Sequence, residues 1–228
     1  MVQRVVIVGR PGTGKTTLAC ELVREWGSDW LWVDTIREFL SYNSTKLFDK
    51  FEQEKIEKIK TLDKLYSKLT NVFFEHTRKI FIREPRRIFF YPPSGGDKKL
   101  LQRMLKYIVL VLQQRAKRWK KDFLIILDES HNYNTNNETC EAIRILLQEG
   151  RHYNLSQIYI SQSPKSVTQD VLRGATHYAV FQLTHPNDLK FFSNFVSPEV
   201  IEKIPALDTG EFILYNVDKG SYTEEKIS

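Results

Sequence analysis

The sequence predicts an α/β fold in which helices pack on a central, mostly parallel β-sheet. An apolar segment, 4–8, runs directly into a glycine-rich turn and a helical segment. Residues 123–127 form a continuous apolar run, which is typical of a strand buried on both faces of a parallel sheet. Strand-like and helix-like segments then alternate to about residue 217, which favours crossover connections between parallel strands. The 228 residues suffice for one such domain and would crowd two.

The glycine-rich turn after 4–8 has the G-x-x-x-x-G-K-[ST] spacing of a P-loop. Glycines let successive backbone N–H groups turn inward around a phosphate, and the following helix adds its positive dipole end. We expect Lys15 to reach the β- and γ-phosphates and the Thr16 hydroxyl to bind Mg²⁺. The expected cofactors are therefore a nucleoside triphosphate, ATP, and Mg²⁺. The expected nucleotide contacts are Gly9, Pro11, Gly12, Thr13, Gly14, Lys15, Thr16 and Thr17.

The P-loop helix is predicted to end near Trp26, and a second strand, 30–33, is followed by Asp34. The next segment, 35–79, is highly charged, and its apolar residues recur at three- and four-residue steps, which predicts amphipathic helices. We interpret 35–79 as a helical insertion within a single P-loop domain that spans 1–228. The apolar residues of that pattern are Phe48, Phe51, Ile56, Ile59, Leu62, Leu65 and Leu69.

Strand-like segments at 80–82 and 87–91 precede a proline- and glycine-rich break at 92–96 and a long helix. This helix and the residues just after it carry many cations and few acids. Together with a formal net charge of +6, they are compatible with a polyanionic partner, and a solvated helix face is the alternative. The cations are Lys98, Lys99, Arg103, Lys106, Arg115, Lys117, Arg118, Lys120 and Lys121.

The remaining elements are predicted as strands at 123–127, 157–161, 177–183 and 211–217, and helices at 138–148, 187–195 and 199–204. The polar residues 219–228 are expected to be loose. We also expect no membrane span, because the longest apolar runs are far shorter than the roughly 20 residues that a spanning helix needs. We expect no signal peptide, because the first strand starts at residue 4. Cys20 and Cys140 both lie in predicted helices, and we expect an intracellular protein in a reducing compartment.

Two acids end the apolar run 123–127. Asp128 is placed to hold the Mg²⁺ shell opposite Thr16, and Glu129 is placed to polarise an attacking water. Small-molecule kinases must exclude water from the reacting phosphate. The Asp-Glu pair therefore favours hydrolysis over phosphoryl transfer to a metabolite.

The segment 150–164 supplies two further candidates. Gln162 follows a strand expected beside 123–127, where an amide can contact both the attacking water and a γ-phosphate oxygen. Arg151 follows a helix-ending glycine, and its expected exposure suits a cation offered to a neighbouring subunit, worth on the order of 10³–10⁵ in rate. A polar strand end and a solvated surface charge are the simpler alternatives. His131 and His152 form no metal-ligand set with the two distant cysteines and are expected to be surface or supporting residues.

The pattern Gly-Arg-x-x-x-Leu-Ser…Ser-Gln-x-Pro over 150–164, downstream of Leu-Asp-Glu at 127–129, resembles the HerA/FtsK superfamily of DNA-pumping ATPases. The Gly-Glu-Phe step at 210–212 resembles the family's closing strand. Small size and the lack of an accessory domain make the chain most similar to genome-packaging ATPases of viruses with internal membranes, of the archaeal turreted icosahedral type. The likeness covers the P-loop region and about 123–217, and leaves out 35–79.

The resemblance implies an ASCE-type, RecA-like P-loop NTPase core, a three-layer sandwich, that assembles as a homo-oligomeric ring, with a hexamer expected, around double-stranded DNA. It implies a host-cytoplasmic or virion location, with a capsid vertex or viral membrane protein as a further partner. Arg151 is its candidate trans-acting arginine, and Arg173 and the group Arg83, Arg86 and Arg87 stay open as alternatives. The matching catalytic positions are Lys15, Thr16, Asp128, Glu129 and Gln162.

We therefore expect an ATP-hydrolysing motor that packages double-stranded viral DNA into a preformed capsid. One alternative keeps the ATPase and changes the cargo, as in phage morphogenesis, secretion or conjugation motors. A small-molecule kinase is the other alternative, with the arginines at 83–87 as its lid. The Asp128-Glu129 pair and Gln162 argue against the kinase.

Overall fold

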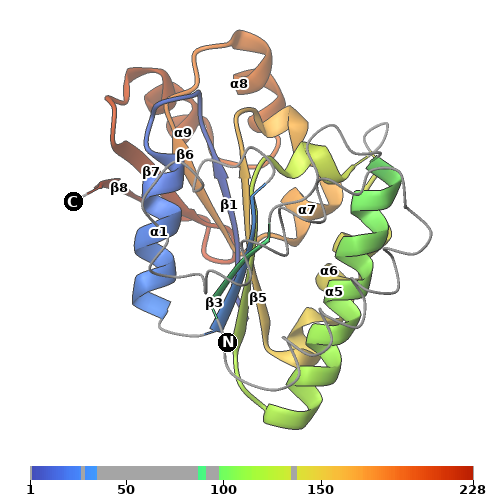
Figure 1. The fold of residues 1–228 in the computed structure, drawn as a ribbon. Helices are drawn as coiled ribbons and strands as arrows, with labels where there is room; N and C mark the ends of the chain where they lie inside the picture. The colour runs from blue at the N-terminus through green and yellow to red at the C-terminus, as the bar shows by residue number, and fades with distance from the viewer. Residues whose placement is uncertain (1, 27–28, 35–86, 91–97, 135–137, 228) are drawn as a thin grey trace.

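The computed structural model describes residues 2–26, 29–34, 87–90, 98–134 and 138–227. Its strands form one eight-stranded sheet in the order β3-β2-β4-β5-β1-β6-β7-β8, with helices on both faces (Figure 1). The first six strands in this order are parallel, and β7 and β8 join antiparallel at one end. The predicted α/β fold with a mostly parallel sheet is confirmed. The strands are β1 Arg4–Val8, β2 Asp29–Val33, β3 Arg87–Phe90, β4 Phe123–Leu127, β5 Leu155–Ser161, β6 His177–Phe181, β7 Glu211–Asn216 and β8 Ser221–Lys226.

The register of the parallel strands sets where their ends lie. Val33 of β2 pairs with Leu127 of β4, and Val8 of β1 pairs with Ser161 of β5. The residues that follow these four strands therefore meet along one side of the sheet, which we call the carboxyl edge. The opposite side, where the parallel strands begin, is the amino edge. Open parallel sheets bind ligands outside the carboxyl ends of their strands.

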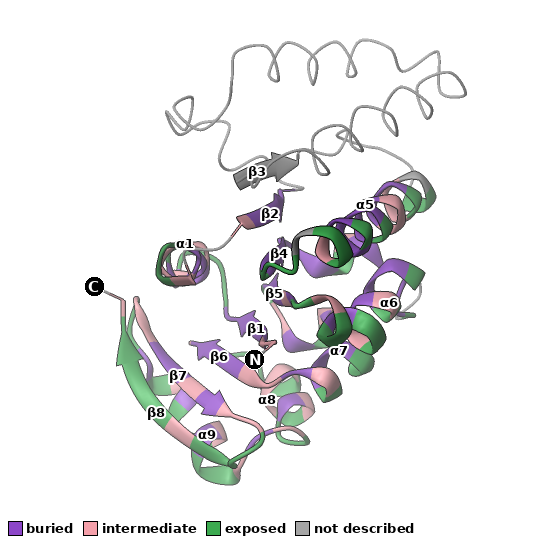
Figure 2. Ribbon diagram, turned by 90° about the horizontal axis from the view of Figure 1, so that it is seen from below, coloured by how far each residue is buried: buried purple, intermediate pink, exposed green. Residues whose placement is uncertain are grey.

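The helices divide unequally between the two faces of the sheet. Helix α1 packs on one face, and α5, α6 and α7 pack on the other (Figures 1 and 2). Every residue of β1 and β4 is buried, as expected for strands covered on both sides. The helices are α1 Lys15–Trp26, α5 Lys98–Trp119, α6 Glu141–Glu149, α7 Gln169–Gly174, α8 Pro186–Phe192 and α9 Pro198–Lys203, with 3₁₀ turns η2 Ser130–Tyr133, η3 Gly150–Tyr153, η4 Pro164–Ser166 and η5 Ile204–Ala206.

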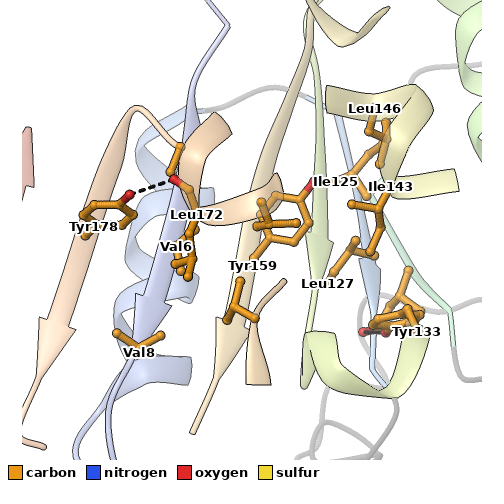
Figure 3. Close-up of a cluster of buried hydrophobic side chains, with 14 of the residues drawn as sticks. Val6, Val8, Ile125, Leu127, Tyr133, Ile143, Leu146, Tyr159, Leu172 and Tyr178 are labelled. Atoms are coloured by element: carbon orange, nitrogen blue, oxygen red, sulfur yellow. Dashed lines mark hydrogen bonds between the residues drawn. The ribbon is translucent and has the colours of Figure 1, made fainter. Parts of the chain in front are cut away.

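The larger apolar core lies between the sheet and the helices α5 to α7. Ile125 and Leu127 of β4 face Ile143 and Leu146 of α6 in this layer (Figure 3). The core also holds buried hydroxyls, and each of those in Figure 3 finds a partner: the Tyr178 hydroxyl, for example, donates to the Leu172 carbonyl at 2.7 Å. This packing fixes β4 and β5, the two strands that carry the candidate acids and Gln162.

The C-terminal segment differs from the prediction. Residues 219–228 were expected to be loose, and β8 instead pairs antiparallel with β7 along its whole length. Pairing at a sheet edge relies on backbone hydrogen bonds, and five of the six β8 side chains are exposed, so the sequence carries no apolar alternation to reveal the strand. The six-residue α7 was not predicted either, and β5 begins two residues before the predicted start.

Several sequence predictions fall on residues outside the described ranges. These are the helical insertion at 35–79, the strand at 80–82, and two of the candidate arginines, Arg83 and Arg86. Cys20 lies in α1 as predicted, whereas Cys140 lies directly before α6 and not within it, and neither forms a disulfide with a described residue. Across the described ranges, no helix combines the length and apolar character needed to cross a lipid bilayer.

Candidate active site

The P-loop connects β1 to α1 at the carboxyl edge, and two of its glycines have no space for a side chain. A Cβ on Gly9 would lie 2.5 Å from the Cβ of Phe181. A Cβ on Gly14, whose φ is +110°, would lie 2.4 Å from the Cδ1 of Ile227. The loop therefore needs glycine at both positions, for close approach at the first and for conformation as well at the second.

The carbonyl oxygen of Arg10 organises the interior of the loop. It accepts hydrogen bonds from the Thr13 hydroxyl and from the Lys15 ammonium, both at 2.8 Å. The backbone of the loop is also tied to the β7 side of the sheet, because the Gly210 N–H donates to the Thr13 carbonyl at 3.0 Å. Lys15 is buried and begins α1, so a cation and a helix N-terminus lie together at this turn. Such a combination attracts anions, phosphates in particular.

Asp128 and Glu129 follow β4 at the same edge, and both are almost fully buried. The Asp128 carboxylate accepts the Glu129 N–H at 2.9 Å, and the Asp128 N–H donates to the Val33 carbonyl at 3.2 Å. Glu129 has φ +46° and ψ +60°, the left-handed region that residues with a side chain seldom adopt. Such a backbone costs on the order of 1–3 kcal/mol and is characteristic of functional sites.

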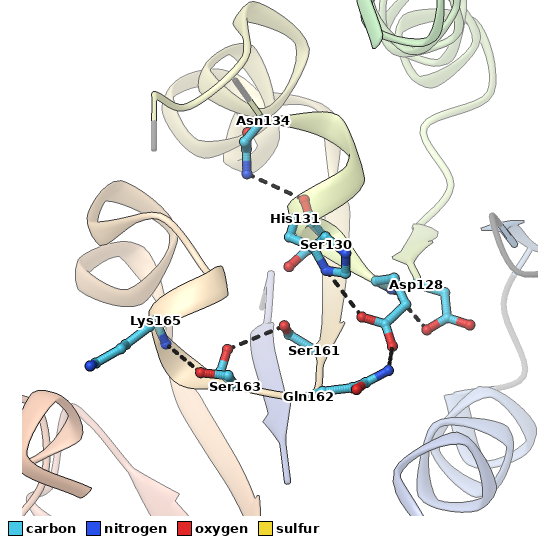
Figure 4. Close-up of polar contacts among 9 residues, drawn as sticks. Asp128, Ser130, His131, Asn134, Ser161, Gln162, Ser163 and Lys165 are labelled. Carbon is cyan, nitrogen blue, oxygen red and sulfur yellow. Dashed lines mark hydrogen bonds and ion pairs between the residues drawn. The ribbon is translucent and has the colours of Figure 1, made fainter. Parts of the chain in front are cut away.

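Gln162 lies next to Glu129, although 33 residues separate them in the sequence. Its amide Nε2 donates to Glu129 Oε1 at 2.7 Å (Figure 4). The contact forms because β4 and β5 are parallel neighbours and Gln162 directly follows β5. The structure thus brings two of the sequence-predicted site residues into direct contact.

The other oxygen of Glu129 has a different neighbour. His131 Nδ1 lies 3.1 Å from Glu129 Oε2, which is ion-pair distance, but the imidazole N–H is not aligned for a hydrogen bond. Oε2 is buried and receives no hydrogen bond from the described residues. Oε2 can therefore accept a hydrogen bond inside the site. His131, expected as a surface or supporting residue, is half-exposed beside it.

Sequence reasoning noted Asp34 only as the end of a strand and missed its place in the site. Asp34 is completely buried directly after β2, and its neighbour Val33 pairs with Leu127, the residue before Asp128. An acid after an apolar strand is the signal that identified Asp128, and the same signal at 30–34 would have found Asp34. The carboxyl edge thus collects three buried acids on two adjacent strands.

The candidate arginines lie at the amino edge, far from Glu129 of the same chain. Arg151 is exposed in η3, directly before β5, and Gln162 follows the other end of that seven-residue strand. At about 3.3 Å per residue, the strand separates the two by roughly 20 Å. Arg173, near the end of α7, also precedes a parallel strand, and Arg87 is the first residue of β3. Neither Arg151 nor Arg173 is placed beside its own chain's P-loop.

The basic helix α5 is less uniformly available than its sequence suggests. Arg115 is buried, forms an ion pair with Asp29 and lies 4.9 Å from the centre of the Phe123 ring, so it is not exposed to an external phosphate. Lys106 forms an ion pair with Glu141 at 2.6 Å. Of the nine cations noted in the sequence, Arg115 is thus structural, because it closes the end of α5 onto β2 and β4. The exposed cations are Lys98, Lys99, Arg103, Lys117, Arg118, Lys120 and Lys121.

Within the described ranges, no group of three or more histidine, cysteine, aspartate and glutamate side chains could hold a metal ion. A metal at the P-loop would instead depend on the nucleotide phosphates for part of its coordination shell.

Comparison with solved structures extends the likeness of fold to the whole chain. The genome-packaging NTPase B204 of Sulfolobus turreted icosahedral virus 2, solved with AMPPCP, is 17% identical with a TM-score of 0.73, covering 100% of this chain and 98% of B204. VirB4 of Thermoanaerobacter pseudethanolicus is 14% identical with a TM-score of 0.64, covering 99% of this chain and 89% of VirB4. The conjugative coupling protein TrwB is 10% identical with a TM-score of 0.65, covering 99% of this chain and 84% of TrwB. At these identities the likeness establishes the fold.

Curated sequences give shorter matches. The DNA double-strand break repair helicase HerA of Sulfurisphaera tokodaii is 28% identical over 97 residues, 40% of this chain and 20% of HerA. HerA of Sulfolobus acidocaldarius is 26% identical over 117 residues, 46% of this chain and 24% of HerA. The chain thus spans between a fifth and a quarter of these relatives, and its resemblance to the HerA/FtsK superfamily is confirmed. Residues 5–181 match the model of the ATPase family associated with various cellular activities (AAA), and the chain belongs to this family of ATPases.

Proposed function

We propose that the chain is an ATP-hydrolysing motor that translocates double-stranded DNA and packages it into a preformed viral capsid. The observation that carries this proposal is the 2.7 Å hydrogen bond from Gln162 to Glu129 at the edge of the sheet where the P-loop lies. It couples the acid best placed to activate water to a second strand of the sheet. A motor needs such a coupling, because ATP hydrolysis must move a part of the protein that contacts the cargo.

The P-loop fits the phosphates of ATP. Glycines at 9 and 14 let the loop pass close to Phe181 and Ile227, and Lys15 supplies a buried cation at the start of α1, where a helix N-terminus favours an anion. Mg²⁺ prefers hard oxygen ligands, and we expect the Thr16 hydroxyl and the Asp128 carboxylate to contribute them. When bound, the metal would neutralise charge on the phosphate oxygens.

We assign Glu129 to orient and polarise the attacking water. Its buried Oε2, with no hydrogen bond from the described residues, is an acceptor suited to a water proton. Gln162 holds the other oxygen, and by exchanging this partner for a γ-phosphate oxygen it would report the state of the nucleotide. Arg151, on the opposite edge of the sheet, would complete the site of a neighbouring subunit in a ring, for which a hexamer is expected.

Three observations support DNA as the cargo. HerA helicases match in sequence, a genome-packaging NTPase matches in fold over 98% of its length, and exposed cations lie on α5 and just after it. Contacts from lysine and arginine to phosphates are independent of base sequence and weaken strongly with salt. We expect the motor to work in the host cytoplasm or at the virion, with a capsid vertex or viral membrane protein as partner.

The likeness to VirB4 and TrwB favours a second candidate, an ATPase for conjugation or secretion that moves single strands or protein. Its TM-scores of 0.64 and 0.65 lie below the 0.73 of the packaging NTPase. A small-molecule kinase has less support, because the buried Asp128-Glu129 pair serves hydrolysis.

The test is the ATPase rate at low salt with duplex DNA, with single-stranded DNA and without DNA, alongside the mass in solution with and without nucleotide. Stimulation specific to duplex DNA and a nucleotide-dependent ring support packaging. Stimulation by single strands supports the conjugation-type candidate, and an unstimulated monomer contradicts both motors.

The variant Glu129→Gln tests the assignment of the base. General-base catalysis contributes about 10²–10⁴-fold, so the variant should lose at least 10²-fold in turnover and still bind ATP. Glu202→Gln, an exposed position on α9, is the matched control and should leave turnover unchanged. Normal turnover in Glu129→Gln would remove Glu129 from its role.

A further inference from the structure

The side chain of Glu129 is held firmly at one of its two oxygens. Gln162 fixes Oε1 with a hydrogen bond of 2.7 Å, whereas the polar neighbour of Oε2 among the described residues is the His131 imidazole, with Nδ1 3.1 Å away. The terminal torsion angle of a glutamate side chain, χ3, varies over a broad range, so one hydrogen bond leaves the plane of the carboxylate free to rotate. A general base needs a defined direction for its acceptor lone pair, because small misplacements lower the rate steeply.

His131 is itself positioned by a well-anchored turn. It lies in η2, where the Tyr133 hydroxyl donates to the Val33 carbonyl at 3.1 Å and the Asn134 amide donates to the Ser130 carbonyl at 3.3 Å. The Gln102 side chain of α5 also donates to the Tyr133 carbonyl, at 2.8 Å. The turn is thus fastened to β2 and to α5. The backbone that carries His131 is therefore fixed next to Glu129.

Burial makes a second donor valuable at Glu129. Its side chain is 6% exposed, and a carboxylate removed from water keeps its charge only when donors compensate for the lost hydration. The left-handed backbone of Glu129 also needs contacts that offset its cost. Among the described residues, His131 lies within reach to supply a second N–H on the Oε2 side, after a rotation of the ring that aligns it. Hydrogen bonds in catalytic sites are often poorly aligned without substrate and tighten in the reacting complex.

We propose that His131 is a positioning residue for the reaction, which together with Gln162 fixes the plane of the Glu129 carboxylate. This inference rests on the proposed role of Glu129 as the base that activates water. Nδ1 occupies one acceptor position of Oε2 and leaves the other to the attacking water. His152, which is exposed at the amino edge, has no acidic partner among the described residues and provides an internal comparison.

The test is the ATPase rate of three variants. His131→Ala should lower kcat about tenfold, as expected for a lost hydrogen bond to a charged group, and leave KM and the Kd for ATP unchanged. His131→Asn should recover most of kcat, because its amide nitrogen takes the place of Nδ1. His152→Ala should be unchanged. A wild-type kcat in His131→Ala, or no recovery in His131→Asn, overturns the proposal.

A double variant tests whether His131 and Gln162 act on the same carboxylate. Because both anchor one group, His131→Ala with Gln162→Ala should lose less in kcat than the product of the two single losses. Losses that multiply would mean that the two side chains act separately, which overturns the proposal.

A spectroscopic measurement gives a readout that does not depend on turnover. The imidazole resonances of His131, identified by their loss in His131→Ala among the five histidines of the chain, should shift in Glu129→Gln without nucleotide. Unchanged resonances overturn the proposal. If Glu129→Gln retains normal turnover, the assigned base itself is wrong. If Glu129→Gln is inactive and His131→Ala is normal, only the present inference fails.

Discussion

The two edges of the sheet differ in the charged groups that they bury and in the contacts of those groups. At the carboxyl edge, the buried acids Asp34, Asp128 and Glu129 follow two adjacent strands. At the amino edge, two arginines, Arg4 and Arg115, are buried. Arg4 is buried there and donates to the Gly174 carbonyl at 2.9 Å, and its burial, with the nearby Arg151, lowers the pKa of its guanidinium.

The difference separates chemistry from structural support. Buried acids next to a phosphate-binding loop are costly to fold and are kept where a metal and a water can use them. The arginines of the amino edge mostly tie helices to strand starts, as Arg115 does through its ion pair with Asp29. Arg151 is exposed and makes no such contact within the described ranges, so the comparison predicts that it either acts on a neighbouring subunit or is a solvated surface charge.

The largest expected effect is that of Arg151→Ala, which tests whether the amino edge of one subunit completes the carboxyl edge of its neighbour. Arg151→Ala should lower turnover about 10³-fold in the assembled protein, because a trans-acting arginine contributes on the order of 10³–10⁵. Mixing Arg151→Ala with Glu129→Gln should restore part of the activity. Some interfaces in the mixture would combine an intact Glu129 from one subunit with an intact Arg151 from its neighbour. ATPase assays of the two variants, alone and mixed, measure this.

Arg173→Ala is the matched control, since Arg173 is also exposed at the amino edge. If Arg173→Ala is the inactive variant that complements Glu129→Gln, the trans-acting arginine is misassigned. If Arg151→Ala retains full turnover, Arg151 is a solvated surface charge.

A second prediction concerns the structural role of the amino edge. Arg115→Met should lower the free energy of unfolding by about 3 kcal/mol, because it leaves the partly buried Asp29 without its cation. Its effect on DNA affinity should be small. Arg103→Met, exposed on the same helix, should reduce the salt dependence of DNA binding by about one unit of slope and leave stability unchanged. Urea unfolding and DNA titrations at several salt concentrations distinguish the two variants. Equal effects on both properties would contradict the division of α5 into structural and exposed cations.

A third prediction sharpens the account of the P-loop. Gly14→Ala must hold a side chain at positive φ and displace Ile227, so it should lose about 2–3 kcal/mol of stability and much of its ATP affinity. Gly12 also has positive φ, +77°, but a Cβ there would meet nothing within 4 Å. Gly12→Ala should therefore cost only about 1 kcal/mol, the backbone contribution alone. Calorimetric titration with ATP and urea unfolding measure the pair, and equal losses would show that the contact with Ile227 is unimportant.

Much of the carboxyl edge could be predicted from the sequence, because its signals are local. A P-loop is readable over eight residues, and Asp128 and Glu129 directly follow the clearest apolar run. Gln162 was predicted because the strand before it was expected beside 123–127, and the register of β4 and β5 confirms that neighbourhood. Asp34 was missed, although it has the same local pattern.

The amino edge was harder to predict, because its contacts join residues far apart in the sequence. The ion pair of Arg115 with Asp29 spans 86 positions, and a helix rich in lysine and arginine gives no sign that one cation is buried. The strand β8 was missed for a related reason. Its stability comes from backbone pairing with β7, and its polar side chains resemble those of a disordered tail.

The smallest expected effect concerns His177, at the start of β6 on the amino edge. The amide nitrogen Nδ2 of Asn216 can only donate, so its 3.2 Å contact requires His177 Nε2 to accept, which places the ring proton on Nδ1, 3.0 Å from the Thr176 hydroxyl. Burial lowers the pKa of His177, so the folded state favours the neutral ring. The resulting stability is complete above the unfolded pKa of about 6.5 and is lost as the pH falls through the lower folded pKa. Since the ring is half-buried and screened, we expect this stability to be at most about 1 kcal/mol, the value of one hydrogen bond.

Urea unfolding at pH 7.5 and pH 5 should show this decrease in the wild type and in His152→Gln, and a smaller decrease in His177→Gln. An equal decrease in His177→Gln would mean that the pH dependence arises elsewhere, and that the amino edge is insensitive to the charge of this ring.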